Sequence, residues 1–258
     1  DLDMPKFAAN LTMLFTEHAF LDRFDHAAKA GFKAVEFLFP YAFHPGDIKR
    51  RLDANGLALV LHNLPAGNWD AGERGIACHP DRVGEFRSGV SQAIEYATAL
   101  GVPQLNCLAG VRVSGSDALA ATNSLTDNLR FAAGECARAD INLNLEPINT
   151  IDVPAYLVAT SDYALHVMDQ VGAPNLRLQY DWYHMAMMGE DLVESTRRLL
   201  PHIGHIQFAD APGRHEPGSG ETNFAQLFAL VDEIGYQGWV SAEYRPSGNT
   251  GDSLGWLR

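Results

Sequence analysis

The sequence predicts an α/β fold, a single (β/α)8 TIM barrel that takes in residues 1–258 as one domain. Three observations lead to this prediction. Short apolar runs alternate with helical patterns, at about 32 residues for each pair. Several helical patterns stop at a glycine just before the next apolar run. The length of 258 residues suits a closed barrel of eight strands and is enough to bury a large core without disulfides.

Eight apolar runs have the length and composition of buried strands. In chain order they are residues 6–11, 34–39, 57–64, 104–110, 141–146, 176–181, 203–210 and 239–244. Between them, segments 20–30 and 224–234 place apolar residues on one helical face. The glycines expected to end helices in a left-handed conformation are Gly31, Gly56, Gly101, Gly172, Gly204 and Gly235. Strands that each lead into a helix form a parallel sheet, and at this length the sheet closes.

A doubly wound open sheet is the rival fold, but no GxGxxG motif follows the first strand. One stretch fits neither strand nor helix. Residues 65–80 are polar and rich in glycine, and a loop of this length is typically functional or disordered. Because it carries Trp69 and the neighbours Glu73 and Arg74, we expect a lid over the mouth of the barrel.

The charge balance argues against some classes of function. The chain has 32 acidic and 19 basic residues, a net charge of -13, whereas nucleic acid is bound by clustered Lys and Arg. No apolar run reaches the roughly 20 residues that cross a membrane, and no signal peptide is evident. Cys78, Cys107 and Cys136 show no CxxC spacing and are expected to be reduced thiols. We therefore expect a cytoplasmic protein with no nucleic-acid or membrane partner.

Polar residues gather near the carboxyl ends of the predicted strands, where barrels of this type build their active sites. They are Glu36, His62, Glu146, Asp181, Gln207 and Glu243, with His184 just after the sixth strand. Because side chains alternate along a strand, one phase puts Glu146, Asp181 and Glu243 inside and their apolar neighbours outside. The same phase puts Gln207 inside. Two residues deeper it places Asn144, Gln179, His205 and Ser241, which predicts a buried hydrogen-bonded layer under the site.

Three carboxylates that converge repel one another unless a cation neutralises them. Glu146, Asp181 and Glu243, with the carbonyl oxygen of Gln207, form an all-oxygen set that suits Mg²⁺ or Mn²⁺. The sequence has no HxH or HExxH motif, which argues against a zinc hydrolase. Each acid alone could be an ordinary capped or ion-paired residue at a strand end. Their common phase on successive strands favours a site.

These residues also carry a resemblance to a known family. The sequence resembles the hydroxypyruvate isomerases, including the closely similar 2-oxo-tetronate isomerases, within the xylose-isomerase-like barrel superfamily. The resemblance runs through Val35-Glu36-Phe37, His62-Asn63-Leu64-Pro65-Ala66-Gly67, Gly72-Glu73-Arg74-Gly75-Ile76-Ala77-Cys78, Glu146-Pro147-Ile148-Asn149, Gln179-Tyr180-Asp181, Gly204-His205-Ile206-Gln207 and Glu243-Tyr244.

The resemblance implies a divalent metal held by Glu146, Asp181, Gln207 and Glu243. It also implies that Glu146 and Glu243 act as the acid and base of catalysis. Ketose 3-epimerases of the same superfamily mostly carry His where Gln207 stands. The glutamine therefore favours the hydroxypyruvate branch.

The expected activity is that of an isomerase that moves a carbonyl between adjacent carbons through an enediolate. Hydroxypyruvate would give tartronate semialdehyde, and a 2-oxo-tetronate is the alternative substrate that the motifs do not separate. The substrate is an anionic small molecule, so Arg74 and Arg214 are candidates to bind its carboxylate. His62 and His184 are candidates to bind its other oxygens.

Other classes of function stay open at this point. A ketose 3-epimerase would share the metal ligands, and a non-catalytic sugar-acid-binding barrel would keep the fold without a proton-transfer pair. An abasic-site endonuclease would need more histidine ligands and a basic groove, which the sequence lacks. The sequence leaves open whether the chain forms a homo-oligomer.

Overall fold

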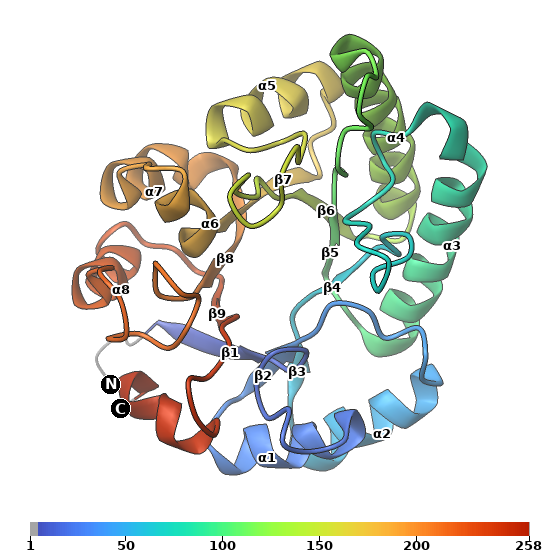
Figure 1. Cartoon of the computed structure of the whole chain (residues 1–258). Coiled ribbons are helices and arrows are strands. Elements are labelled where there is room, and N and C mark those ends of the chain that lie inside the picture. Colours follow the sequence, from blue (N-terminus) through green and yellow to red (C-terminus); the bar gives the residue numbers. More distant parts are fainter. Residues whose placement is uncertain (1–4, 258) are drawn as a thin grey trace.

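Parallel strands surrounded by helices form a closed barrel (Figure 1). The computed structural model describes residues 5–257. The strands are β1 (Lys6–Asn10), β2 (Ala34–Glu36), β3 (Ala58–Leu59), β4 (His62–Asn63), β5 (Gln104–Cys107), β6 (Asn142–Leu145), β7 (Leu176–Asp181), β8 (Ile203–Phe208) and β9 (Trp239–Ala242). The α-helices are α1 (Arg23–Lys29), α2 (Pro45–Asn55), α3 (Val83–Leu100), α4 (Ala118–Arg138), α5 (Ser161–Val171), α6 (Trp182–Met187), α7 (Leu192–Leu199) and α8 (Phe224–Glu233).

The strand order confirms the predicted barrel and shows how it closes. All ladders are parallel, in the order β3-β2-β1-β9-β8-β7-β6-β5-β4. The two ends of this order, β3 and β4, are halves of the one strand predicted at 57–64, interrupted at Val60 and Leu61. Because β3 pairs with β2 and β4 pairs with β5, this short segment of chain connects the two edges of the sheet and closes the barrel.

The helix ends follow the glycine pattern with one exception. Gly56, Gly101 and Gly172 cap α2, α3 and α5 in the left-handed conformation. The prediction for Gly204 was wrong, because this residue lies inside β8. A side chain there would place its Cβ 2.6 Å from the Cβ of Arg177, so glycine allows β8 to pack closely against β7.

The outward and inward faces of the strands have opposite character. The outward residues are apolar and pack under the helices; they include Leu143, Leu145, Leu178, Tyr180, Ile206 and Phe208. Inside, Asn144 donates to Gln104 at 3.0 Å and to Gln179 at 3.2 Å, and Gln179 donates to Gln207 at 2.9 Å. Of the layer predicted under the site, Asn144, Gln179 and His205 are hydrogen-bonded, whereas the buried hydroxyl of Ser241 has no partner among residues 5–257.

The loop at 65–80 is polar at its tip and apolar at its foot. The sequence predicted little apolar surface for it, but Ile76, Ala77 and Cys78 are buried in the core. At the foot, the backbone N–H of Cys78 donates to the carbonyl of Ala109 at 2.9 Å. At the tip, Trp69 packs against Phe39, with the ring centres 5.0 Å apart.

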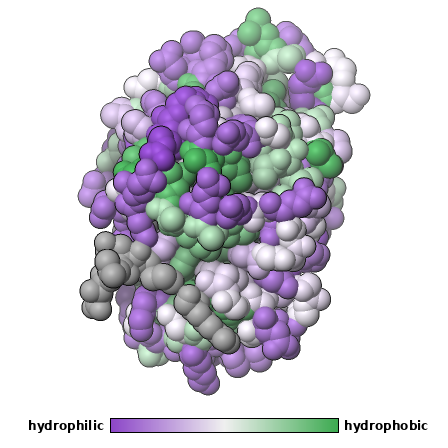
Figure 2. Space-filling model, turned by 90° about the vertical axis from the view of Figure 1, so that its left-hand side faces the viewer, coloured by the Kyte–Doolittle hydropathy of each residue, from purple (hydrophilic) through white to green (hydrophobic). Residues whose placement is uncertain are grey.

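Figure 2 views the side that carries α7 and α8, where hydrophilic side chains dominate and hydrophobic ones show in patches between them. None of the helices within residues 5–257 has the length and apolar character needed to cross a membrane.

Candidate active site at the mouth of the barrel

A cavity of about 630 Å³ lies at the carboxyl ends of the strands. The βα loops converge there because all strands are parallel, so their carboxyl ends share one rim. The lining includes Asn63, Arg74, Asn106, Glu146, Tyr183, His184, Arg214, Glu243 and Arg245. Of the seven polar residues predicted near the strand ends, Glu146, His184 and Glu243 line this space, whereas Glu36, His62, Asp181 and Gln207 are not among its lining residues.

Three buried side chains form what we term the Glu146 cluster: Glu146, Asp181 and His184. Glu146 follows β6, and its Oε1 accepts a hydrogen bond from Asn106 at 3.0 Å. Asp181 ends β7 and caps α6, because its Oδ1 accepts from the backbone N–H of Tyr183 at 2.8 Å. His184 lies one helical turn later, with Nε2 3.9 Å from Glu146 Oε2 and 3.7 Å from Asp181 Oδ2.

The electrostatics of the Glu146 cluster favour a proton or a cation between its oxygens. Burial raises the pKa of Glu146 well above its ordinary value, and the charges of Glu243 and Asp181 add to the shift. Burial likewise raises the pKa of Asp181 to about 6, against the opposing influence of Arg214. Asp181 Oδ2 is buried and accepts no hydrogen bond from any residue within 5–257. An unpartnered carboxylate oxygen beside a second carboxylate is a position that a divalent cation fits.

The Glu243 cluster, formed by Glu243, Asn10, Gln207 and Arg214, is bonded on all sides. Glu243 Oε2 accepts from Gln207 at 2.6 Å and from Asn10 at 3.1 Å. Its other oxygen, Oε1, pairs with Arg214 at 2.8 Å. Burial raises the pKa of Glu243 to about 8, although Arg214 opposes the shift. Glu243 is thus oriented by two amides and neutralised by a guanidinium.

Gln207 turns its amide nitrogen, rather than its oxygen, toward the carboxylates. Nε2 donates to Glu36 at 2.7 Å as well as to Glu243, while Oε1 accepts from Gln179. Both carboxyl oxygens accept these bonds, so the amide nitrogen of Gln207 lies on their side. The oxygen predicted from the sequence as a metal ligand therefore faces Gln179 in this structure.

Arg214 is presented by a loop that Asp210 organises. The buried carboxylate of Asp210 accepts from the backbone N–H groups of Gly218, Gly220 and Thr222 at 2.8 to 3.1 Å. Arg214 itself has a φ of +62°, a left-handed conformation that costs roughly 1 kcal/mol for a residue with a side chain. The surrounding bonds hold this strained backbone so that the guanidinium reaches into the cavity.

The loop at 65–80 supplies a second cation. The guanidinium of Arg74 lies 3.8 Å from the ring centre of Trp69, and both residues line the cavity. Arg74 also donates to the backbone carbonyls of Trp69 and Glu73, at 3.0 Å and 2.7 Å. Arg245, which the sequence analysis did not single out, lines the same cavity.

His62 does not reach this space. It is fully buried beside Phe37 and Tyr41, with ring centres 6.2 Å and 6.1 Å away, and Asn63 lines the cavity in its place. Burial lowers the pKa of His62 to about 4, so its ring is neutral. The structure therefore does not support the expectation that His62 binds substrate: alternation along the strand turns His62 outward and Asn63 inward.

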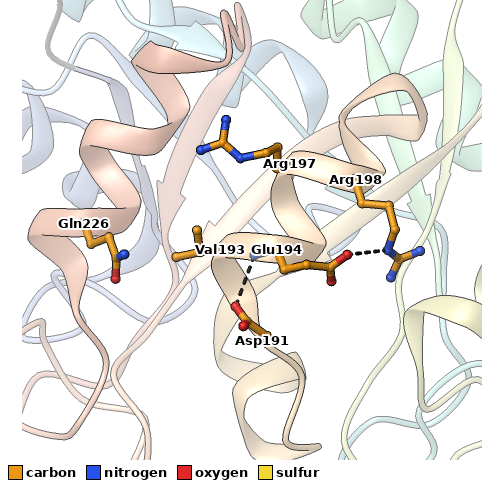
Figure 3. Close-up of a pocket in the computed structure, with 6 residues that line it drawn as sticks. All are labelled: Asp191, Val193, Glu194, Arg197, Arg198 and Gln226. Carbon is orange, nitrogen blue, oxygen red and sulfur yellow. Dashed lines mark hydrogen bonds and ion pairs between the residues drawn. The ribbon is translucent and has the colours of Figure 1, made fainter.

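A second depression lies on the outside of the barrel, between α7 and α8 (Figure 3). Its charges are paired locally: Arg198 bonds Glu194 at 3.1 Å, and Asp191 caps the backbone N–H of Glu194. Such exposed pairs within one helix are ordinary surface features. The cavity at the barrel mouth is thus the candidate active site.

Comparison with known proteins agrees with the fold. The model of the xylose isomerase-like TIM barrel family matches residues 24–258. The 2-oxo-tetronate isomerase of Cupriavidus necator is 44% identical, with 99% of this chain and 98% of the relative covered. The hydroxypyruvate isomerase of Escherichia coli K12 is 46% identical, with 98% of each covered. A solved structure titled AP endonuclease, family 2, from Brucella melitensis is 41% identical with a TM-score of 0.96, and 98% of each chain is covered.

The chain belongs to the xylose isomerase-like TIM barrel family. Within that family it groups with the hydroxypyruvate and 2-oxo-tetronate isomerases, so it is an enzyme of the isomerase class. Both the resemblance and the enzyme class predicted from the sequence are confirmed.

Besides Arg245, the sequence analysis assigned no role to Glu36 or Asn149. Glu36 stood out as a strand-end acid, but only the structure pairs it with His205, at 2.7 Å. Asn149 lies in the Glu-Pro-Ile-Asn motif, and the structure places its amide against His184. The motif was the one available signal for Asn149.

Proposed function

We propose that this enzyme isomerises a small 2-keto hydroxy acid. Hydroxypyruvate would give tartronate semialdehyde, and a 2-oxo-tetronate would react in the same way. The observation that carries the proposal is the pair Glu146 and Glu243: two buried carboxylates with raised pKa values that line one cavity. The activities of the relatives from C. necator and E. coli point to the same substrate class.

In this reaction a carboxylate removes a proton from C3 of hydroxypyruvate, and the electron pair forms the C2=C3 bond of an enediolate. A proton then returns to C2, and the hydroxyl proton on the C3 oxygen is transferred to the C2 oxygen, so that C3 becomes the carbonyl carbon and atoms and charge balance. Glu146 and Glu243 are proposed as the groups that take and return these protons. Burial raises the pKa of Glu243 to about 8, close to neutral pH, where a carboxyl can both accept and give a proton, and it raises the pKa of Glu146 in the same direction.

Glu146, Asp181, Gln207 and Glu243 are proposed to hold Mg²⁺ or Mn²⁺. Glu146 and the unpartnered Oδ2 of Asp181 fit a cation as they stand. Gln207 and Glu243 would each exchange a present hydrogen bond for the ion, with Gln179 and Arg214 as the partners given up. A bound divalent ion would supply positive charge that acidifies the carbon-bound proton and stabilises the enediolate.

The anionic end of the substrate is proposed to bind arginine. Arg214 bonds Glu243 in this structure, and if a metal ion neutralised that carboxylate its guanidinium would be available for the substrate carboxylate. Arg74 reaches the same cavity from the loop at 65–80, and Trp69 beside it would exclude water from the enediolate as a lid.

The test is a panel of substrates with metal-free, Mg²⁺-loaded and Mn²⁺-loaded enzyme. We expect turnover of hydroxypyruvate or a 2-oxo-tetronate, loss of turnover after chelation, and no turnover of six-carbon ketoses or of DNA with an abasic site. Epimerised ketose as the main product would instead indicate a 3-epimerase. Tight binding of keto acids without product, at saturating metal, would indicate a binding protein.

A further inference from the structure

Asn149 is a buried residue whose amide has a fixed orientation. Its Oδ1 accepts hydrogen bonds from the backbone N–H groups of Ile151, at 3.1 Å, and Asp152, at 2.8 Å. A backbone N–H can only donate, so the side-chain atom that faces both must be the oxygen. The Nδ2 group of Asn149 therefore points the other way.

On that other side, Asn149 Nδ2 lies 2.8 Å from His184 Nδ1. The backbone N–H of Asn149 points to the same ring nitrogen at 3.5 Å. A nitrogen that faces two donors must accept, so Nδ1 keeps its lone pair. A ring with one unprotonated nitrogen is neutral, so the single proton of the imidazole is on Nε2.

The contacts around the amide reinforce this arrangement. Nδ2 also lies 3.3 Å from Asp152 Oδ2, and the same oxygen accepts from the hydroxyl of Tyr183. The amide nitrogen is thus held between a carboxylate and a ring nitrogen, both of which act as acceptors. Turning the amide over would break four favourable contacts at once, because Oδ1 would then face Asp152 Oδ2 and His184 Nδ1.

This tautomer determines what Nε2 can do, and Nε2 lies between the two acids of the Glu146 cluster. Distance alone makes His184 a third candidate ligand beside Glu146 and Asp181. In the tautomer described above, Nε2 carries a hydrogen and has no lone pair to give to an ion. At 3.7 Å and 3.9 Å from the carboxylates it makes no short bond to either, so its N–H points into the space between them.

We infer that Asn149 is a positioning residue that holds His184 as the Nε2–H tautomer, which makes the ring a neutral hydrogen-bond donor to a substrate oxygen and keeps it out of the coordination of any metal. The assignment of the acceptor to the substrate rests on the proposed function; the tautomer does not. A donor aimed at an oxygen that gains negative charge in the enediolate stabilises the transition state more than the ground state.

The tautomer is measured directly by long-range ¹H–¹⁵N correlation spectra of the protein labelled at histidine, with His184→Gln to assign the signals. We expect Nδ1 to show the shift of an unprotonated nitrogen and Nε2 that of an N–H, in the metal-free protein and at saturating Mg²⁺. Zn²⁺ is the more demanding probe, because it prefers imidazole ligands. A protonated Nδ1, or loss of the Nε2 hydrogen on addition of either ion, would overturn the inference.

Asn149→Asp tests the role of the amide with little change of shape. Its carboxylate would draw the ring proton to Nδ1, so we expect the tautomer to change and kcat to fall about 100-fold with KM changed less than threefold. Asn175→Asp is the matched control, because Asn175 binds two backbone carbonyls outside the cavity; it should lower stability without moving the His184 signals.

The outcomes separate the two claims. A changed tautomer with unchanged kcat would overturn the positioning role, and a reduced kcat with an unchanged tautomer would do the same. If Asn149→Asp does not fold, Asn149→Ser replaces it. The shorter side chain leaves only the 3.5 Å contact from the backbone N–H of residue 149 to His184 Nδ1. If His184 then stays entirely in the Nε2–H tautomer, the amide has no role in setting it. If the wild-type enzyme turns over no keto acid, the proposed function fails while the tautomer measurement still stands.

Discussion

The Glu146 cluster and the Glu243 cluster line the same cavity but satisfy their carboxylates in opposite ways. Glu146 accepts a single hydrogen bond from Asn106, and Asp181 keeps one oxygen without a partner among residues 5–257. Glu243 is bonded by two amides and by Arg214. The first cluster is open to a ligand, whereas the second is held in place before any ligand arrives. The chain thus supplies its own cation to one glutamate and leaves the other without one.

The largest expected effect comes from removing each glutamate as a proton carrier. Glu146→Gln and Glu243→Gln keep the size and one oxygen, so we expect each to retain metal but to lower kcat roughly 1000-fold at saturating Mn²⁺. Asp181→Asn should act mainly through metal affinity, because it is assigned no proton to carry, and excess Mn²⁺ should restore much of its activity.

The measurement is turnover at saturating metal, together with exchange of the substrate's C3 hydrogen in deuterated solvent. The variant that lacks the base should lose this exchange, while a variant that lacks only the acid should keep it. If both glutamine variants recover with metal as fully as Asp181→Asn, neither glutamate is the acid or the base.

How far the sequence predicted this site depends on the range of the interactions. The period of two along each strand was enough to place Glu146, Asp181 and Glu243 inside the barrel. The same period also predicts that His62 faces outward, once Asn63 is taken as the inward residue. The pairing of Glu36 with His205 joins residues 169 apart, and no local pattern encodes it.

Loop geometry sets a second limit on prediction from the sequence. Arg214 reaches Glu243 only because Asp210 gathers the loop around it and because a non-glycine residue adopts a positive φ. Neither feature has a periodic signal. For the same reason the sequence led to Gln207 as a predicted metal ligand but not to the orientation of its amide. That orientation depends on three neighbours from different strands.

A second prediction concerns the loop at 65–80, whose foot lies against the end of β5, next to the Asn106 that supports Glu146. Gly75 has a φ of +104°, and a Cβ there would collide with the carbonyl oxygen of Leu108. We expect Gly75→Ala to displace the loop and lower kcat/KM roughly 100-fold, since a shift of about 1 Å can cost that much.

Gly72→Ala is the matched control for this variant. Gly72 has a similar φ of +93°, but a Cβ there would meet nothing within 4 Å. It therefore carries the backbone strain without the collision, and its kcat/KM should stay within about fivefold of wild type. An equal loss of kcat/KM in both variants would mean that backbone strain in the loop, and not its contact with Leu108, controls the site.

A third prediction tests whether Arg214 stands in for a metal at Glu243. Arg214→Met removes a positive charge beside three carboxylates, so Mn²⁺ should bind the substrate-free protein about tenfold more tightly. The KM for hydroxypyruvate should rise at the same time, because its carboxylate loses a partner. Titration calorimetry with Mn²⁺ measures the first effect and steady-state kinetics the second.

Arg245→Met is the control, since Arg245 lines the cavity without a bond to Glu243. Its Mn²⁺ affinity should change less than twofold. Weaker Mn²⁺ binding by Arg214→Met would show that the arginine supports the metal site instead of competing with the ion.

The smallest expected effect separates the two clusters by their pH dependence in the metal-free protein. A carboxyl whose pKa is raised on folding holds its proton in the folded state at pH values where the unfolded chain has lost it. Stability therefore falls as pH rises between the unfolded and the folded pKa. For Asp181 of the Glu146 cluster this window ends near pH 6, whereas for Glu243 it ends near pH 8. Between pH 6.5 and 7.5, Glu243→Gln should therefore flatten the decline of the thermal midpoint, and Asp181→Asn should leave it nearly unchanged. One proton corresponds to about 1.4 kcal/mol per pH unit, or about 2–4 °C for a protein of this size, which calorimetry resolves. Equal slopes in the two variants would mean that the two clusters do not lose their protons in separate pH ranges.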